Sequence, residues 1–163
     1  MPGNFTASET LNMLRVIFEK HRNERVCVVG TICTGKSTLF TQLPEYNCED
    51  LDDALWPNLP KEAAAHLNEL NKPPWTAENG SEIHKIISTY GRVKPGRPLF
   101  GTTILCCEAV VYLDIPDALL MKHCKKRGDS FDFAKKYKEA IESDWNAHKV
   151  KGGKTFYYLT VTE

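Results

Sequence analysis

The sequence predicts an α/β fold in which helices cover both faces of a mainly parallel sheet, and two observations support it. Short apolar runs rich in β-branched residues alternate along the chain with stretches of helical periodicity. The run from Val26 to Val29 shows no polar alternation, as expected of a strand that is buried on both sides. Because no linker or repeat divides the 163 residues, we expect residues 1–163 to form a single domain.

The first elements follow from local signals. Thr6 and Glu9 have the spacing of a capping box, and apolar residues recur on one face, so a helix is expected over 6–22. After the strand that ends at Gly30, a second helix is expected over about 35–43, where a proline stops it.

The middle of the chain predicts one short strand and two helices. Residues 46–48 suit a strand, which leads into the acidic cluster 49–53. Residues 61–71 suit a helix that the prolines of 73–75 end, and Ser81 would cap another helix that runs to Tyr90.

Two apolar runs, 99–104 and 109–115, are expected to be strands. Only residues 105–108 separate them, whereas a parallel crossover needs a dozen or more residues. The two strands therefore cannot be adjacent parallel partners. Either they form an antiparallel hairpin, or one of the two predictions is wrong.

The last third of the chain predicts two helices and a strand. A helix is expected from Asp117 to about Arg127, and a longer amphipathic helix from Asp132 to about His148. After a turn that contains two glycines, residues 155–161 are rich in β-branched and aromatic side chains and are expected to form the final strand.

Composition excludes several classes of function. The chain has 21 Lys and Arg against 21 Asp and Glu, so it lacks the overall basic field of a nucleic-acid or membrane-surface binder. No stretch approaches the ~20 apolar residues of a membrane helix, and the N-terminus has no secretory core. We expect an intracellular, cytoplasmic protein (in the host cytoplasm, for a viral source) with no membrane partner. The six cysteines form no CxxC pair, which favours reduced thiols over a zinc site or disulfides.

Residues 30–37 read Gly-Thr-Ile-Cys-Thr-Gly-Lys-Ser and match the pattern G-x-x-x-x-G-K-[ST] between a strand and a helix. Such a loop points successive N–H groups at phosphate oxygens, and the helix that follows adds the positive end of its dipole. Lys36 would reach the β- and γ-phosphates of ATP, and the Ser37 hydroxyl would bind Mg²⁺. The alternative is a strand-to-helix turn that carries a lysine by chance. The residues expected to contact ATP are Gly30, Thr31, Ile32, Cys33, Thr34, Gly35, Lys36, Ser37 and Thr38.

The acidic cluster is the second functional signal. In a P-loop kinase the second strand ends across the cleft from the phosphate loop, where a carboxylate can accept the proton of an attacking hydroxyl or bind Mg²⁺. Asp52 is the first candidate and Asp53 the second. The alternative role is a helix N-cap, for which aspartate is also suited.

The order of phosphate loop, short helix, strand and Asp-Asp pair resembles uridine and nicotinamide riboside kinases and the kinase domain of polynucleotide kinase. The resemblance implies the three-layer P-loop NTPase fold, with Asp52 as the catalytic base. The stretch 111–116 and the basic helix end 125–129 are similar to the region that leads into the lid of these kinases, which implies that Arg127 approaches the ATP phosphates or adenine.

The sequence also departs from these families. A helix precedes the phosphate-loop strand, no helix follows the last strand, and no apolar run that ends in aspartate precedes residue 105. Mg²⁺ would then be held by Ser37, Asp52, water and the nucleotide phosphates.

Two observations indicate an alcohol as the acceptor of the phosphoryl group. A kinase of anionic monophosphates typically uses several arginines at its acceptor, whereas two of the six here lie on the N-terminal helix and only one lies in the probable lid, 125–136. A carboxylate base also suits a hydroxyl nucleophile. We therefore expect an ATP-dependent kinase that phosphorylates a hydroxyl of a nucleoside-like small molecule.

Two alternatives remain at the level of sequence. Aromatic and basic residues between the Asp pair and residue 100 are compatible with a nucleic-acid substrate, phosphorylated at a 5′-hydroxyl or at a hydroxymethylated base in DNA, as in viral DNA modification. These residues are Trp56, Trp75, Tyr90, Arg92, Lys94, Arg97 and Phe100. A P-loop NTPase without kinase activity is the second alternative, which the missing Walker B element disfavours.

Overall fold

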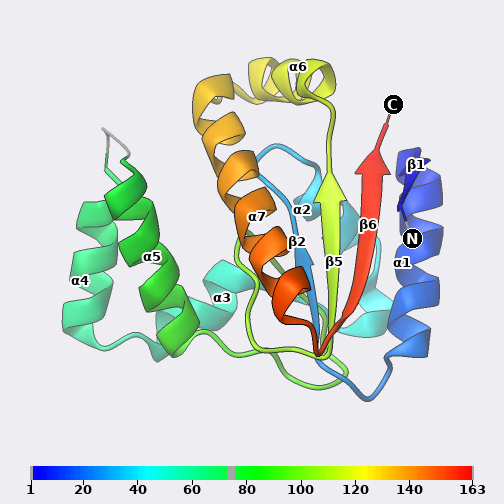
Figure 1. Ribbon diagram of the computed structural model, residues 1–163, viewed down its shortest axis with the longest axis horizontal. Coiled ribbons are helices and arrows are strands. Elements are labelled where there is room, and N and C mark those ends of the chain that lie inside the picture. Colours follow the sequence, from blue (N-terminus) through cyan, green and yellow to red (C-terminus); the bar gives the residue numbers. More distant parts are fainter. Residues whose placement is uncertain (1, 73–75, 163) are drawn as a thin grey trace.

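The computed structural model describes residues 2–72 and 76–162, in which one sheet of six parallel strands has the order β1-β6-β5-β2-β4-β3 (Figure 1). The predicted α/β class and parallel sheet are confirmed, and the described part of the sheet is wholly parallel. The strands are β1 (Pro2–Phe5), β2 (Val26–Val29), β3 (Glu49–Asp50), β4 (Leu99–Gly101), β5 (Ala109–Asp114) and β6 (Thr155–Val161).

Helices cover both faces of this sheet. The α-helices are α1 (Ala7–Lys20), α2 (Lys36–Thr41), α3 (Leu51–Leu55), α4 (Lys61–Leu70), α5 (Ala77–Tyr90), α6 (Asp117–Arg127) and α7 (Phe131–Lys151). Two short 3₁₀ turns, η1 (Pro44–Tyr46) and η2 (Trp56–Asn58), follow α2 and α3.

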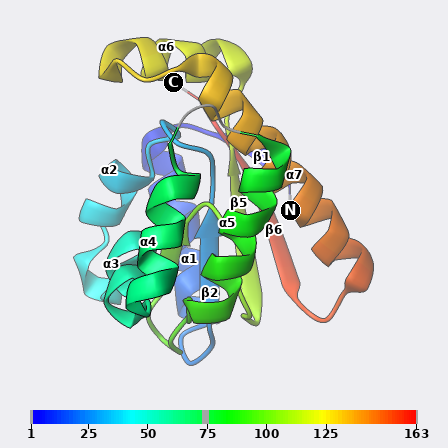
Figure 2. The ribbon, with the colours of Figure 1, turned by 90° about the vertical axis from the view of Figure 1, so that its left-hand side faces the viewer.

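The central strand β2 separates two hydrophobic cores. Val26 and Val28 face α1 and α2, where Leu14 is fully buried. Cys27 and Val29 face the other layer, which contains α3, α4, α5 and α7 (Figure 2). All four residues of β2 are buried, which is why the strand shows no polar alternation. The molecule therefore has three layers, with the sheet in the middle.

The local signals at the start of the chain predict α1 correctly. The Thr6 hydroxyl accepts a hydrogen bond from the Glu9 amide, and the Glu9 carboxylate accepts one from the Thr6 amide, so the capping box is confirmed. The strand β1 has no counterpart in the sequence prediction. It pairs in parallel with β6, so that Pro2 stands opposite Tyr158 at the edge of the sheet.

The predicted strand at 46–48 is wrong. Pro44 begins a 3₁₀ turn instead, and Asn47 ends that turn with a left-handed φ of 54°. The strand β3 lies immediately afterwards and pairs with β4. The acidic cluster 49–53 therefore begins inside the sheet and continues into α3.

The crossover between β4 and β5 resolves the conflict seen in the sequence. Both strands are parallel to β2 and lie on opposite sides of it, so neither alternative of the sequence analysis holds as stated. The first run ends as a strand at Gly101, three residues earlier than predicted. Residues 102–108 then return to the amino end of β5 without a helix.

Other boundaries differ by a few residues. Thr76, not Ser81, caps α5 through a hydrogen bond from the Asn79 amide to its hydroxyl. Ser130 caps α7 in the same way, which starts that helix one residue before the predicted Asp132. The prolines of 73–75 lie outside the described residues. All six cysteines are free thiols, as expected. Within the described ranges, no helix has both the length and the apolar character needed to cross a bilayer.

Candidate functional site

Residues 30–37, which match the pattern G-x-x-x-x-G-K-[ST], form a curled loop at the carboxyl end of β2. Its backbone enters the left-handed region at Cys33 (φ 65°) and again at Gly35 (φ 106°), which begins α2. Two buried threonines support this shape. The Thr34 hydroxyl donates a hydrogen bond of 2.7 Å to the Thr31 carbonyl, and the Thr31 hydroxyl donates one of 2.5 Å to the Ala134 carbonyl on α7. The curl is therefore fixed both internally and by the helix above it.

The ammonium group of Lys36 lies inside this curl. Its Nζ donates hydrogen bonds of 2.5 Å to the Gly30 carbonyl and 2.7 Å to the Thr31 carbonyl. Burial lowers the pKa of Lys36 to about 8, although the negative charges of Asp50 and Asp52 act in the opposite direction. The cation therefore faces a site that already contains two carboxylates.

These carboxylates come from the junction of β3 and α3. Asp50 is the N-cap of α3, because its side chain accepts a hydrogen bond of 3.0 Å from the Asp52 amide. The capping role that the sequence left open for Asp52 thus belongs to Asp50. Burial raises the pKa of Asp52, and repulsion from Asp50 and Asp53 raises it further.

A glycine allows this acidic turn to come close to the loop. A Cβ at Gly101, at the end of β4, would lie 2.8 Å from the Cβ of Leu51. The first residue of α3 therefore packs directly against the backbone of the strand next to β2. The same glycine accepts a hydrogen bond of 3.2 Å from the Gly30 amide, so it holds both the loop and the acidic turn.

Basic side chains approach from the end of α6, which lies above the carboxyl ends of the strands (Figure 1). Arg127 forms an ion pair of 3.3 Å with Asp129, and the Cys33 thiol donates to the same carboxylate at 3.3 Å. His123 Nδ1 contacts the Cys33 carbonyl at 2.9 Å. The last turn of α6 is therefore attached to the loop itself.

All three groups border one cavity of about 630 Å³. Loop residues Ile32 to Thr38 line one side, and Asp50 and Asp52 line another. Arg127 and its neighbour Lys126 complete the charged part of the wall. The structure thus brings together the predicted loop, one predicted carboxylate and the predicted arginine.

Three predicted site residues do not line the cavity. Gly30 and Thr31 form the buried base of the loop, where their backbone carbonyls bind Lys36. Asp53 is exposed and lies in the first turn of α3, outside the cavity lining.

Seven residues that the sequence did not indicate also line the cavity: Leu51 and Gly101, which form the close contact described above, and Asp50, Thr102, His123, Lys126 and Tyr137. Asp50 belongs to the acidic cluster 49–53, where the sequence favours Asp52, and Lys126 belongs to the basic helix end 125–129, where it favours Arg127. Thr102 follows the end of β4, which is where ligands bind in parallel sheets, so that signal was available once the strand was placed. His123 and Tyr137 have no recognisable motif and are brought to the cavity by the packing of α6 and α7.

The oxygen donors of the cavity suit Mg²⁺. Carboxylates at Asp50 and Asp52 and a hydroxyl at Ser37 border the same space, and hard oxygen ligands are those that Mg²⁺ prefers. Within the described ranges, no cluster of three or more His, Cys, Asp or Glu side chains is found that could hold a metal ion alone.

Among the described members of the aromatic and basic set between Trp56 and Phe100, Phe100 alone lines the cavity. Lys94 and Arg97 each lie 3.6 Å from the Glu49 carboxylate, and Arg92 donates to the carbonyls of Thr89 and Gly91. Phe100 is buried in the core and borders the cavity from below. Trp75 lies outside the described residues.

Comparison of the chain with protein-family models and with curated proteins gives no significant match. The site is therefore interpreted from its own geometry and chemistry.

Proposed function

We propose that this protein is an ATP-dependent P-loop kinase that transfers the γ-phosphoryl group to a hydroxyl of a nucleoside-like small molecule. One observation carries the proposal: a lysine inside a curled phosphate-type loop faces a carboxylate with a raised pKa across the same cavity. A loop lysine alone is compatible with hydrolysis, whereas a facing carboxylate also provides a base for an alcohol.

Each charged group has a role in the proposed reaction. The loop amides and Lys36 hold the β- and γ-phosphates, and Lys126 and Arg127 balance charge from the opposite wall. Ser37 and Asp50 would hold Mg²⁺, which would neutralise charge on the phosphate oxygens. Asp52 accepts the proton of the acceptor hydroxyl while the oxygen of that hydroxyl forms a bond to the γ-phosphorus. The bond from that phosphorus to the bridging oxygen breaks, and ADP leaves.

The acceptor is expected to be small. The basic residues proposed as a nucleic-acid track are paired with Glu49 or bonded to backbone carbonyls, and none of these three, Arg92, Lys94 and Arg97, lines the cavity. The site thus favours a small alcohol over the nucleic-acid alternative.

The test is a transfer assay with γ-labelled ATP over nucleosides, sugars, and plain or hydroxymethylated oligonucleotides. Wild type should label at least one low-molecular-weight alcohol. Lys36→Met should reduce that transfer by at least two to three orders of magnitude, because this chemistry depends almost wholly on electrostatics. Lys20→Met is the control, since Lys20 is an exposed residue at the end of α1. ATP hydrolysis with no labelled acceptor would instead identify a simple NTPase.

A further inference from the structure

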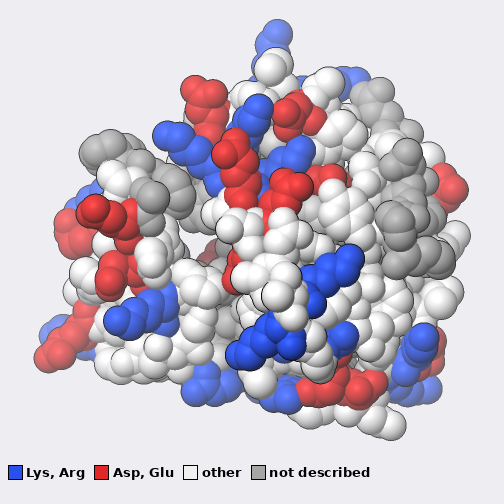
Figure 3. Space-filling model, in the orientation of Figure 1, with Lys and Arg blue, Asp and Glu red and all other residues white. Residues whose placement is uncertain are grey.

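A groove between α5 and α7 adjoins the phosphate-binding cavity. It has a volume of about 440 Å³ and is bordered by Ile83 and Ile87 on α5 and by Ala140 and Ala147 on α7. The space-filling view shows the corresponding furrow between the lobe of α4 and α5 and the body that carries α7 (Figure 3). The alanines leave the α7 side of the groove open.

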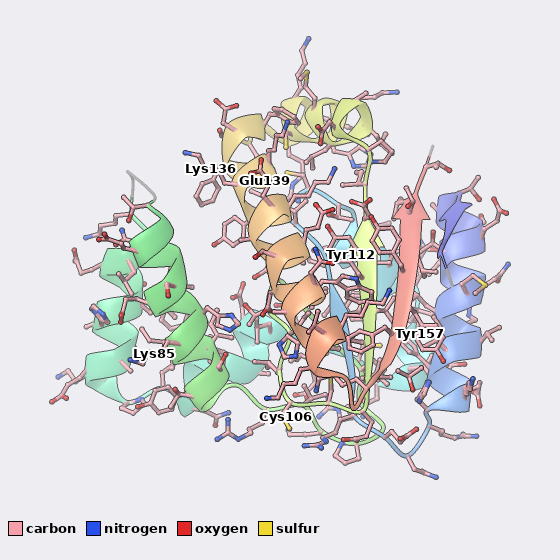
Figure 4. All side chains as sticks on the ribbon, viewed as in Figure 1. Lys85, Cys106, Tyr112, Lys136, Glu139 and Tyr157 are labelled. Carbon is pink, nitrogen blue, oxygen red and sulfur yellow. The ribbon has the colours of Figure 1, made fainter. Side chains whose placement is uncertain are left out.

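The groove and the cavity share two lining residues, Thr102 and Tyr137. Tyr137 lies one turn before Ala140 on the half of α7 that Lys136 and Glu139 mark in Figure 4. Burial raises the pKa of Tyr137, and the charge of Asp52 raises it further. Tyr137 and the proposed base, Asp52, line the same cavity, and Tyr137 lies where the groove adjoins that cavity.

The charge of the groove contrasts with that of the cavity. The cavity is bordered by Lys36, Lys126 and Arg127, whereas no lysine or arginine is among the described residues that line the groove. Its one carboxylate, Asp144, lies 3.5 Å from His148. An anionic group that entered this groove would lose water and meet no lysine or arginine there, which costs free energy.

Size and polarity together define the ligand that the groove fits. A volume of about 440 Å³ falls within the range of small-molecule sites, roughly 300–1,000 Å³. Isoleucine and alanine side chains suit an apolar or aromatic ring, and Thr102 and Thr103 supply hydroxyls at its floor. Such a ring would lie in the groove while its hydroxyl extends past Tyr137 toward Asp52.

We propose that the groove between α5 and α7 is the acceptor site, and that it selects a ring-bearing alcohol without a phosphate group. This assignment rests on the proposed kinase function. It excludes phosphorylated acceptors and DNA as preferred substrates, because their phosphates would have to enter or pass a groove whose described lining has no lysine or arginine and a single histidine, His84.

The assignment is tested with a matched pair of acceptors and a matched pair of variants. Thymidine and thymidine 3′-monophosphate offer the same 5′-hydroxyl and differ by one phosphate, and a hydroxymethylated oligonucleotide is the third probe. We expect kcat/KM for thymidine to exceed that for the monophosphate by at least about tenfold. Ala140→Trp should fill the groove and raise KM for thymidine by at least about tenfold while ATP affinity stays unchanged. Asn146→Trp adds the same side chain at an exposed position of α7 that lines neither cavity, and it should match wild type.

The outcomes separate the groove from the kinase itself. Equal transfer by wild type and Ala140→Trp, with Lys36→Met inactive, overturns the groove and leaves the kinase standing. A higher kcat/KM for thymidine 3′-monophosphate or for the oligonucleotide than for thymidine also overturns the groove and leaves the kinase standing. Absence of transfer to all three probes and to the wider acceptor set overturns the kinase and the groove together. Circular dichroism and ATP binding of Ala140→Trp show that a loss of transfer is not a loss of folding.

Discussion

At the scale of single residues, Lys36 links the site to pH. Burial lowers its pKa to about 8 in the free protein, so the ammonium loses its proton as pH rises through that value. Because ATP phosphates bind the charged form, ATP affinity should be highest below about pH 8. Above it, the dissociation constant should rise by up to about tenfold per pH unit.

This prediction is checked by calorimetric titration of ATP from about pH 7.5 to about pH 9.5. Cysteine thiols also ionise in this range, so Lys36→Met, which keeps all six cysteines, provides the baseline. Lys36→Met has no group to titrate at this position and should show weak binding with a flat profile. A wild-type profile as flat as that of the variant would show that the lysine does not contact the phosphates.

The carboxylates of the acidic turn separate into two roles. As the proposed general base, Asp52 would contribute roughly 10²–10⁴ to the rate, so Asp52→Asn should lower kcat by that factor. Asp50 remains the cap of α3 in this variant, and the melting temperature should hardly change. Steady-state rates and thermal melts measure both quantities.

Asp53→Asn is the matched control, because Asp53 is exposed and does not border the cavity. Its kcat should stay close to wild type. Equal small losses of kcat in Asp52→Asn and Asp53→Asn would indicate that the acidic cluster has a structural role. Loss of Mg²⁺·ATP binding in Asp52→Asn would make that carboxylate a metal ligand rather than the base.

At the scale of elements, the contact between β4 and α3 positions the acidic turn. In Gly101→Ala the added Cβ would lie 2.8 Å from the Leu51 Cβ, so α3 must shift away from the strand. Overpacking of this kind costs about 1–3 kcal/mol, and a displacement of ~1 Å at reacting groups costs about 10²-fold in rate. We expect both losses, measured by denaturant unfolding and by kcat.

Gly153→Ala separates the clash from ordinary glycine strain. Gly153 has a φ of 85°, and a Cβ there would meet nothing within 4 Å. This control should lose about 1–2 kcal/mol of stability and keep its kcat. A Gly101→Ala enzyme with full activity would show that the position of α3 does not matter for transfer.

Elements with local signals were predictable, and those that depend on partners were not. The capping box of α1 and the glycine-lysine loop are determined by neighbouring residues, so their positions follow from sequence. The strand β3 consists of Glu49 and Asp50, which are poor strand formers. It exists because β4 offers hydrogen bonds and because Lys94 and Arg97 neutralise Glu49. The junction of β3 and α3 determines which carboxylates face the cavity. Because β3 was not predictable, Asp50 could not be identified as a cavity residue from the sequence.

At the scale of the whole molecule, α1 completes one of the two cores. Leu14 is fully buried against the sheet, on the opposite side from α5 and α7. Leu14→Ala should therefore lower the free energy of unfolding by about 2–5 kcal/mol. The transfer rate per folded molecule should be unchanged, because the cavity lining does not include α1.

Val16→Ala is the matched control for stability on the same helix. Val16 is 62% exposed, so its truncation should change stability by no more than about 0.5 kcal/mol. Guanidinium unfolding curves of both variants provide the comparison. A similar small effect of both substitutions would mean that α1 covers the sheet only loosely.

The position of β2 in the sheet also has a consequence for the order of events during synthesis. Cys27 pairs with Leu99 and Val26 pairs with Ala109, so the strand that leads into the loop of residues 30–37 finds both neighbours late in the chain. Contacts between such distant segments make folding slow, because the loop-closure entropy is lost before any pairing is gained. While the ribosome adds the residues of α3, α4 and α5, the run from Val26 to Val29 has no strand partner. Its four apolar side chains must remain unpaired until β4 and β5 emerge, which makes this interval the period in which the nascent chain is most exposed to aggregation.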